Sequence, residues 1–222
     1  MRHEIKHRLN PQDDFILTSR LQTLFSHDEH AGSHGSYRVS SLYFDSPYDK
    51  AVKDKLAGVN ERFKIRLRYY GDEPTFIRLE NKMKIGQLTN KISIKVTLAD
   101  ATALIAGDPT CLFTPNDPAR TFFYTHFRNG LLRPVVQVIY EREAFTYLPG
   151  NVRVTLDRHL KTKAGPEGFF HADTPRLDVS DGLTVLEVKY DAFLPEIVKL
   201  AVQTPNRRHE AVSKYIEARR YE

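Results

Sequence analysis

The chain has 222 residues, 41% of them hydrophobic, and a formal net charge of +5. This length and composition allow one sizeable core and demand no second domain, so we expect a single domain over residues 1–222. The lone cysteine, Cys111, excludes an internal disulfide and is consistent with a reducing compartment. No run approaches the roughly 18 apolar residues of a membrane span, so we expect a cytoplasmic chain with no membrane segment.

The first half of the chain predicts strands separated by short helices. Residues 2–9 alternate in polarity and predict a strand, after which Asn10-Pro11 begins a helix over residues 11–25. A strand over residues 37–45 follows, and Ser46-Pro47 begins a helix that ends before Gly58. Three further strands are predicted over residues 62–70, 75–84 and 90–97, and a shorter helix over residues 98–106.

The second half predicts fewer, longer elements. Asp117-Pro118 begins a helix that ends before Gly130, and strands are predicted over residues 134–146, 151–157 and 183–190. Residues 161–181, rich in Gly, Pro and Asp, predict a loop. Pro195 opens an apolar helical run, and residues 210–220 predict a basic terminal helix; both are expected to pack outside the sheet. Long antiparallel hairpins with a few helices indicate an α+β fold.

One face of the strand over residues 62–70 is entirely cationic. Arg62, Lys64, Arg66 and Arg68 alternate there with apolar and aromatic residues. Side chains two apart on a strand lie about 6.5–7 Å from each other. At an effective dielectric near 20, each neighbouring pair of like charges costs roughly 2 kcal/mol. Either an anion or water must therefore lie over this face.

The same bias recurs in four other segments, where charged side chains share one parity. These side chains are Arg2, Glu4, Lys6 and Arg8; Arg78, Glu80, Lys82 and Lys84; Lys91 and Lys95; and Glu187 and Lys189. An ordinary sheet with one solvated face explains any single strand, but the recurrence favours a shared polyanion site. If these faces converge, the sheet must curl. The expected architecture is a closed antiparallel eight-stranded β tunnel with a charged interior and helices packed outside.

Seven motifs in this order resemble the catalytic domain of the vacuolar transporter chaperone, or VTC. They are R-x-E-x-K at 2–6, YFDSP at 43–47, IRLRYY at 65–70, LENKMK at 79–84, YER at 140–142, LEVKY at 186–190 and SKY at 213–215. The resemblance spans essentially the whole chain. It implies a polyphosphate polymerase of the triphosphate tunnel metalloenzyme superfamily, with a Mn²⁺ or Mg²⁺ ion near the phosphates.

The resemblance also implies roles for individual residues. Catalytic contacts with phosphate are implied for Arg66, Arg68, Lys82, Lys91 and Arg142. Substrate binding is implied for Lys6, Tyr140, Ser213 and Lys214, and metal binding for Glu187. By their parity or placement, further residues are expected to bind substrate, namely Arg2, Lys64, Lys84, Arg153 and Lys189.

Several of these assignments leave alternatives open. Glu4 and Glu80 are candidate metal ligands, but ion pairs with Lys6 or Lys82 explain them equally well. Asp157, in phase with Arg153, is open in the same way. Ser93 stands where similar sequences carry a second basic residue after the lysine aligned with Lys91, so Lys95 is an alternative phosphate contact.

The implied reaction moves the γ-phosphoryl group of ATP onto polyphosphate and releases ADP, so ATP and polyphosphate are the expected partners. Phosphoryl transfer needs positioning and charge neutralisation, which arginine forks and lysine point charges supply. Two alternatives are a triphosphatase of the same superfamily and a non-catalytic module that binds polyphosphate or inositol phosphate. Arg2 stands where hydrolytic relatives carry a glutamate, which favours the polymerase. Nucleic-acid binding is not expected, because the residues between the cations are chiefly aliphatic and lie on the opposite face.

Overall fold

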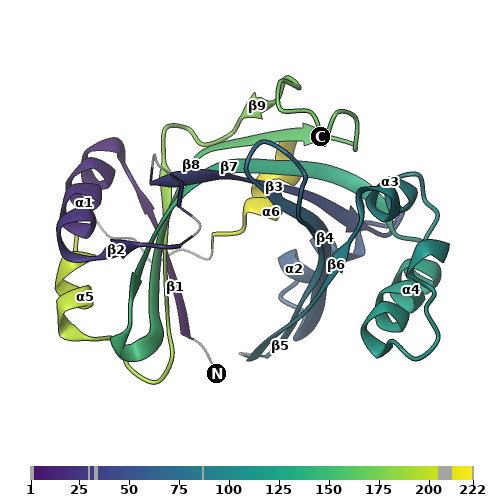
Figure 1. Ribbon diagram of the computed structural model, residues 1–222, viewed down its shortest axis with the longest axis horizontal. Helices are drawn as coiled ribbons and strands as arrows, with labels where there is room; N and C mark the ends of the chain where they lie inside the picture. Colours follow the sequence, from purple (N-terminus) through teal and green to yellow (C-terminus); the bar gives the residue numbers. More distant parts are fainter. Residues whose placement is uncertain (1–2, 30, 33–34, 87, 205–211, 222) are drawn as a thin grey trace. The chain divides into compact units, whose positions relative to one another are not determined.

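The computed structural model describes residues 3–29, 31–32, 35–86, 88–204 and 212–221, which form an α+β fold with an antiparallel sheet, as expected (Figure 1). The eight predicted strands are β1 (His3–Leu9), β3 (Ser36–Asp45), β4 (Glu61–Tyr70), β5 (Ile77–Ile85), β6 (Leu88–Val96), β7 (Arg133–Tyr147), β8 (Val152–Ala164) and β10 (Thr184–Tyr190). Their hydrogen-bonded order is β1-β10-β8-β7-β3-β4-β5-β6. Two short strands that the sequence did not predict, β2 (Ser26–His27) and β9 (Leu177–Asp178), pair with β7 and β8.

The strand order has two ends, β1 and β6. Within the described ranges these two strands are not hydrogen-bonded to each other, so the expected closure of the tunnel is not formed by strand pairing. Lysines occupy both strands, Lys6 on β1 and Lys91 and Lys95 on β6. Lysine on an edge strand opposes pairing with a further strand, which gives a physical reason for the open ends.

The chain packs as two compact units, each assembled from segments that are distant in sequence. The first unit consists of Met1–Arg38, Ile139–Lys161 and Asp178–Lys214, and the second of Val39–Val138, Thr162–Leu177 and Tyr215–Glu222. Strands β3, β7 and β8 each continue from one unit into the other. The single domain expected over residues 1–222 stays a prediction.

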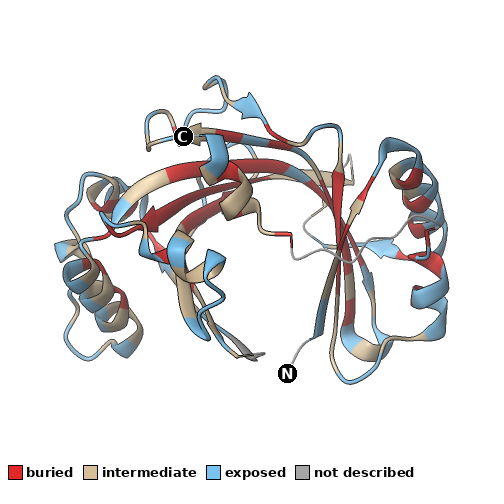
Figure 2. Cartoon of the chain, turned by 180° about the vertical axis from the view of Figure 1, so that it is seen from behind, coloured by how far each residue is buried: buried red, intermediate tan, exposed pale blue. Residues whose placement is uncertain are grey.

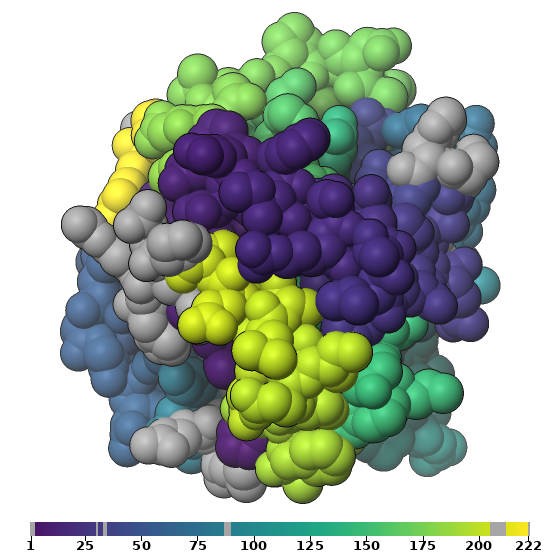
Figure 3. Space-filling view, turned by 90° about the vertical axis from the view of Figure 1, so that its left-hand side faces the viewer, coloured from purple at the N-terminus to yellow at the C-terminus, as the bar shows by residue number. Residues whose placement is uncertain are grey.

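In the first unit, two helices cover the apolar side of the strands. They are α1 (Pro11–Leu24) and α5 (Glu196–Ala201), which lie side by side in purple and yellow-green on the face shown in Figure 3. Asn10 caps α1 as predicted, because its side chain accepts a hydrogen bond of 2.8 Å from the backbone N–H of Asp13. Leu17 and Leu21 of α1 and Val198 of α5 enter a core shared with β8 and β10. This core joins the two helices to the strands of the first unit.

In the second unit, α3 (Leu98–Ile105) and α4 (Pro118–Gly130) cover the apolar side of β4, β5 and β6 (Figure 1). Leu67 and Leu79 of the sheet pack with Leu104, Phe123 and Phe127 of the helices, all of them buried. Burying each such side chain contributes about 1.5–3 kcal/mol. Figure 2 shows buried residues following the strands, whereas the outward sides of α1 and α4 are exposed. The charged parity of β4 to β6 therefore lies opposite the core.

Helix α2 (Lys50–Leu56) begins later than predicted. The Asp45 carboxylate accepts hydrogen bonds from the backbone N–H groups of Ser46 at 2.8 Å and Ala51 at 2.9 Å. The Ser46 hydroxyl accepts a further hydrogen bond, from the backbone N–H of Lys50 at 3.2 Å, and Pro47 lies in a turn before the helix. The predicted start at Pro47 was wrong because the Ser46 and Asp45 side chains cap the N–H groups of Lys50 and Ala51, so the helix begins three residues after Pro47.

Strand β8 is longer than the predicted strand over residues 151–157, and the predicted loop over residues 161–181 begins within it. The backbone N–H of Val179 donates to the carbonyl oxygen of Leu160 at 2.8 Å, and β9 pairs with β8. Strand β8 is thus extended by pairing with a strand from later in the chain. The composition of residues 161–181 is typical of a loop and does not indicate this pairing.

The terminal helix α6 (Lys214–Ala218) lies on the charged side of β4, not on the apolar side as expected. The ring of Tyr215 lies 4.8 Å from that of Tyr43, and the Lys64 ammonium lies 5.0 Å from the Tyr215 ring centroid. Residues 210–211 of the predicted helix lie outside the described residues. Short 3₁₀ segments cover Thr110–Leu112, Pro149–Asn151 and Arg219–Tyr221. In the part of the chain described, no helix has the length and apolarity to cross a membrane.

Candidate functional site

Cations in the second unit line up across three neighbouring strands. Directly opposite residues of an antiparallel pair point to the same face, so strand register decides which charges meet. The register sets Arg68 opposite Arg78 and Arg78 opposite Lys95, and it sets Lys82 opposite both Lys64 and Lys91. We call the resulting surface the cationic face, which comprises Arg62, Lys64, Arg66, Arg68, Arg78, Lys82, Lys84, Lys91 and Lys95. The positive charges of this face far outnumber its negative charges.

Among the described residues of β4 to β6, Glu80 is the one carboxylate that lies on the cationic face. Its Oε2 accepts from Arg66 Nε at 2.9 Å and lies 2.8 Å from Arg66 Nη2, while Lys91 pairs with its other oxygen. Burial disfavours the ionised form of Glu80, which is 1% exposed, but the charges of Arg66 and Arg68 lower its pKa to about 2. This geometry favours the ion-pair interpretation of Glu80 over the metal-ligand one, which stays a prediction.

Two side chains of β3 hold the arginines of β4. Arg66 Nη1 donates to the Tyr43 hydroxyl at 2.9 Å, and Arg68 Nε donates to the Ser41 hydroxyl at 3.0 Å. Burial opposes ionisation of Tyr43, yet the neighbouring positive charge of Arg66 and others lowers its pKa to about 8. The sequence analysis missed both β3 residues. Their signal was parity, because Ser41 and Tyr43 lie opposite Arg68 and Arg66 in the register.

Residues of the terminal segment fix Tyr215 beside this face. The Tyr215 hydroxyl donates to Asp45 Oδ2 at 2.7 Å, and Arg219 donates both to that hydroxyl at 3.0 Å and to Asp49 at 2.8 Å. The motif that includes Ser213 and Lys214 was recognised in the sequence, but the part played by Tyr215 was not. Its hydrogen bond to Asp45 joins the segments at 43–47 and 213–215, which are far apart in the chain.

In the first unit, two carboxylates share one lysine. Lys6 Nζ lies 2.7 Å from Glu4 Oε1 and 3.1 Å from Glu187 Oε2, and Lys189 Nζ lies 2.5 Å from Glu187 Oε1. Register explains the cluster, because Lys6 is opposite Glu187 and Glu4 is opposite Lys189. Burial raises the pKa of Glu187, which is 5% exposed, but Lys6, Lys189 and further cations hold it well below its usual range. Glu187 is therefore a carboxylate at neutral pH.

Asp157 pairs with two of the predicted site residues. Arg142 donates to its two oxygens at 2.6 and 2.8 Å, and Lys214 Nζ lies 2.8 Å from Oδ2. Tyr140 completes the group, since Lys214 lies 4.9 Å from its ring centroid. Burial opposes ionisation of Asp157, but Arg142 and Lys214 lower its pKa to about 2. The geometry favours the ion-pair interpretation of Asp157.

Arg153 is held in a similar way. Its Nε donates to Asp28 Oδ2 at 2.9 Å and its Nη2 to the Tyr37 hydroxyl at 2.8 Å.

The charged groups of the first unit are thus largely arranged as pairs of opposite sign. The cationic face of the second unit has one carboxylate for all its cations. The excess of positive charge on the cationic face therefore suits an anion.

The residues of the first unit fit a hard divalent ion in part. Glu4 and Glu187 supply carboxylate oxygens near a shared lysine, and such oxygens are the ligands that Mg²⁺ and Mn²⁺ prefer. Among the described residues no group of three metal-ligating side chains is found. Magnesium commonly takes one or two carboxylates and completes its shell with water and substrate phosphate, so this pair is compatible with it.

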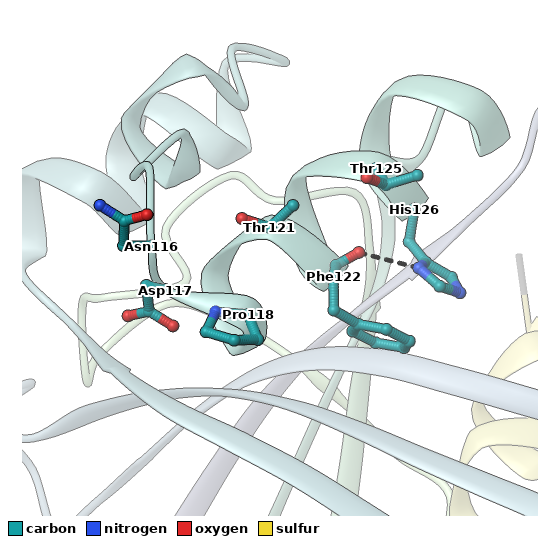
Figure 4. A pocket seen from close by; sticks show the side chains of 7 residues that line it. All are labelled: Asn116, Asp117, Pro118, Thr121, Phe122, Thr125 and His126. Atoms are coloured by element: carbon teal, nitrogen blue, oxygen red, sulfur yellow. Dashed lines mark hydrogen bonds between the residues drawn. The ribbon is translucent and has the colours of Figure 1, made fainter.

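An open hollow of about 520 Å³ on the second unit does not compete for this role. It lies along the start of α4 and is lined by Asn116, Asp117, Pro118, Thr121, Phe122, Thr125 and His126 (Figure 4). No lysine or arginine lines it. The Asp117 carboxylate accepts from the backbone of Arg120 at 3.0 Å, and His126 Nδ1 lies 2.8 Å from the Phe122 carbonyl oxygen. A phosphate would find no cation in this hollow.

The family described as VTC domain matches residues 1–221. The chain belongs to the VTC-domain family. No curated protein matches this VTC domain. Among solved structures, the chain is similar to HpAC1 from Hippeastrum, a candidate adenylyl cyclase with a dominant triphosphatase activity. That likeness has a TM-score of 0.57 at 15% identity and covers 99% of this chain and 96% of that one.

A second similar structure is a candidate adenylate cyclase from Bacillus halodurans. The TM-score is 0.50 at 11% identity, over 89% of this VTC domain and 83% of that chain. At these identities the likeness concerns the fold alone, and it agrees with the antiparallel sheet and helices described above.

The structure groups the predicted site residues by unit. Arg66, Arg68, Lys64, Lys82, Lys84 and Lys91 share the cationic face, whereas Lys6, Tyr140, Arg142, Arg153, Glu187, Lys189 and Lys214 belong to the first unit. Register also places Lys91 and Lys95 on the same face, so both are retained as candidates. Ser213 is half-buried just before α6. Arg2 lies outside the described residues, and the roles of all these side chains stay predictions.

Proposed function

We propose that this VTC domain transfers the γ-phosphoryl group of ATP onto a growing polyphosphate chain and releases ADP. The observation that carries the proposal is the alignment of cations across β4, β5 and β6 with a single carboxylate among them. Along β4 alone, the cations from Arg62 to Arg68 extend over about 20 Å at the usual rise of a strand. A ligand with several linked phosphates matches that extent.

Arginines, lysines and their partners have different roles in this reaction. Arg66 and Arg68 bind phosphate oxygens through their guanidinium forks, and Lys64, Lys82, Lys84 and Lys91 act as point charges. Glu80 and Tyr43 hold the Arg66 guanidinium from two sides, so it is oriented before substrate arrives. Preorganised donors of this kind stabilise charge that develops in the transition state without reorganising at the moment of reaction.

Glu187, with Glu4, would hold Mn²⁺ or Mg²⁺, and a divalent ion bound to phosphate oxygens neutralises developing charge. Lys6 and Lys189 keep the Glu187 carboxylate ionised and oriented. Asp157 pairs with Arg142 and Lys214, and the Tyr140 side chain contacts both of these cations. We assign Arg142 to catalytic contact with phosphate, and Lys214 and Tyr140 to substrate binding. Arg153, Lys189 and Ser213 are assigned there too.

The reaction needs no protein nucleophile. A terminal phosphate oxygen of the acceptor attacks the γ-phosphorus of ATP, the bond from that phosphorus to the β–γ bridging oxygen breaks, and ADP leaves with the electron pair. Arginines stay protonated at any relevant pH, so they neutralise charge throughout the step. We place this activity in the cytoplasm, as expected from the sequence.

A triphosphatase is the second candidate. The fold is similar to that of HpAC1, in which a triphosphatase activity is dominant, and water in place of the acceptor phosphate would give hydrolysis on the same cationic face. A module that binds polyphosphate or inositol phosphate without turnover is the third. All three would bind a triphosphate, so only the products separate them.

Incubating the purified protein with ATP and Mn²⁺ tests the proposal. We expect ADP together with long-chain polyphosphate, detected by gel electrophoresis and ³¹P spectroscopy. Orthophosphate without polyphosphate would support the triphosphatase, and binding without turnover would support the non-catalytic module. Glu187→Gln, which keeps the shape but removes the charge of the proposed metal ligand, should lose product formation while retaining the fold by circular dichroism.

A further inference from the structure

Two aromatic side chains lie beside the cations at one end of the cationic face. Tyr70 ends β4 and shares the parity of Arg66 and Arg68, and Phe76 immediately precedes β5. The two residues are 37% and 39% exposed, so neither belongs to the apolar core on the other side of the sheet. This end of the face is therefore both charged and aromatic.

Phe76 contacts cations on this side of the sheet. The Arg78 guanidinium lies 4.8 Å from its ring centroid and the Lys95 ammonium 5.0 Å from it. Arg78 and Lys95 are opposite each other in the register, and Arg68 is opposite Arg78, so the ring adjoins a row of three cations. Within the described residues no carboxylate pairs with Arg78 or Lys95. The row can accept an anion while the ring offers a flat apolar surface.

A linear polyphosphate has no group that uses such a ring. Its phosphates need charge and hydrogen-bond donors, which the guanidinium and ammonium groups of the rest of the face provide. A nucleoside triphosphate has both parts, an anionic chain and a planar base, and bases stack on aromatic side chains and on arginine planes. The pairing of Phe76 and Tyr70 with a cation row matches that combination.

We infer that Phe76 and Tyr70 bind the base of a nucleoside triphosphate while Arg68 and Arg78 bind its first phosphates. This inference rests on the proposed function and deepens it by giving the substrate a direction. With the base at Phe76, the phosphate chain runs along β4 past Arg66 toward Lys64. The acceptor polyphosphate then approaches from the Arg62 end of the face.

Phe76→Ala tests the inference when ATP and tripolyphosphate are titrated separately into the full chain by calorimetry. We expect ATP affinity to fall about 10-fold or more, because stacking on one aromatic ring contributes that much to binding of a base. Tripolyphosphate, which has no base, should bind with unchanged affinity. Phe76→Trp should restore ATP binding, and Phe113→Ala, which removes a phenylalanine 61% exposed elsewhere on the same unit, should change neither affinity.

The outcomes separate the inference from the function on which it rests. An equal loss of ATP and tripolyphosphate binding in Phe76→Ala would mean that the ring only positions Arg78 and Lys95, which overturns base binding. No loss for either ligand would overturn it as well. If the wild-type protein bound neither ligand, the proposed function itself would fail.

Discussion

Replacing Arg66 by alanine should lower the affinity for tripolyphosphate by at least about 100-fold and abolish turnover, with little change in the free energy of unfolding. Each hydrogen bond to a charged group contributes about 1.5–3 kcal/mol, and the guanidinium fork offers two to a phosphate. The fold should tolerate the change because Arg66 lies opposite the apolar core and Glu80 keeps Lys91 and Arg68 as partners. Calorimetry and urea denaturation measure the two quantities independently.

Arg128→Ala is the matched control. Arg128 is an exposed arginine in the last turn of α4, on the helix layer that packs against the apolar side of β4. Its loss should affect neither binding nor stability. Arg66→Lys should bind with intermediate affinity, since it keeps the charge but loses the fork. Unchanged tripolyphosphate binding in Arg66→Ala, or loss of binding only because the protein unfolds, would contradict the assignment.

Asp157→Ala should destabilise the protein by about 3–5 kcal/mol. Breaking a buried ion pair by removing one partner leaves an uncompensated charge in a poorly hydrated site. Here the substitution strands two cations, Arg142 and Lys214, because both pair with the same carboxylate. The midpoint of urea denaturation should fall, with a slope close to that of the wild type.

Two comparisons make this result specific. Glu141→Ala, at an exposed carboxylate near Arg142 in the chain, should change stability by less than about 0.5 kcal/mol. The Asp157 pKa is lowered from 3.8 to about 2, so its contribution is complete above pH 3.8 and is lost as the pH falls toward 2. Glu80 and Glu187, whose pKa values are also lowered, cause an acid loss in both proteins, so between pH 3.8 and 2 the wild type should lose more stability than Asp157→Ala. Equal stability of the variant and the wild type at pH 7 would refute the buried-pair account.

The strands were predictable because their signal is local. Alternation of charge and apolarity in residues 62–70 fixed both the extent of β4 and which side faces the core, and proline after an N-cap residue marked the starts of α1 and α4. The failures came from contacts that the local sequence does not contain. The start of α2 depends on how far the Asp45 side chain reaches, the length of β8 on its pairing with β9, and the side of α6 on the contact between Tyr215 and Lys64.

The candidate site likewise has a part that the sequence predicts and a part that depends on distant contacts. Parity identified the cations of the cationic face, since a side chain's direction on a strand follows from its position alone. Pairing was not predictable, because whether Asp157 meets Arg142 or a metal ion depends on register and on the terminal helix that carries Lys214. The same holds for Tyr43, whose hydroxyl becomes an arginine partner only through the register of β3 and β4.

A crystal structure with Mn²⁺ and a non-hydrolysable ATP analogue tests the central claim most directly, namely that the cationic face of β4 to β6 binds the phosphate chain. The account predicts phosphate oxygens about 2.7–2.9 Å from the guanidinium nitrogens of Arg66 and Arg68. A fully occupied triphosphate bound elsewhere, for example in the hollow beside α4, with the cationic face in contact with solvent alone, would contradict it.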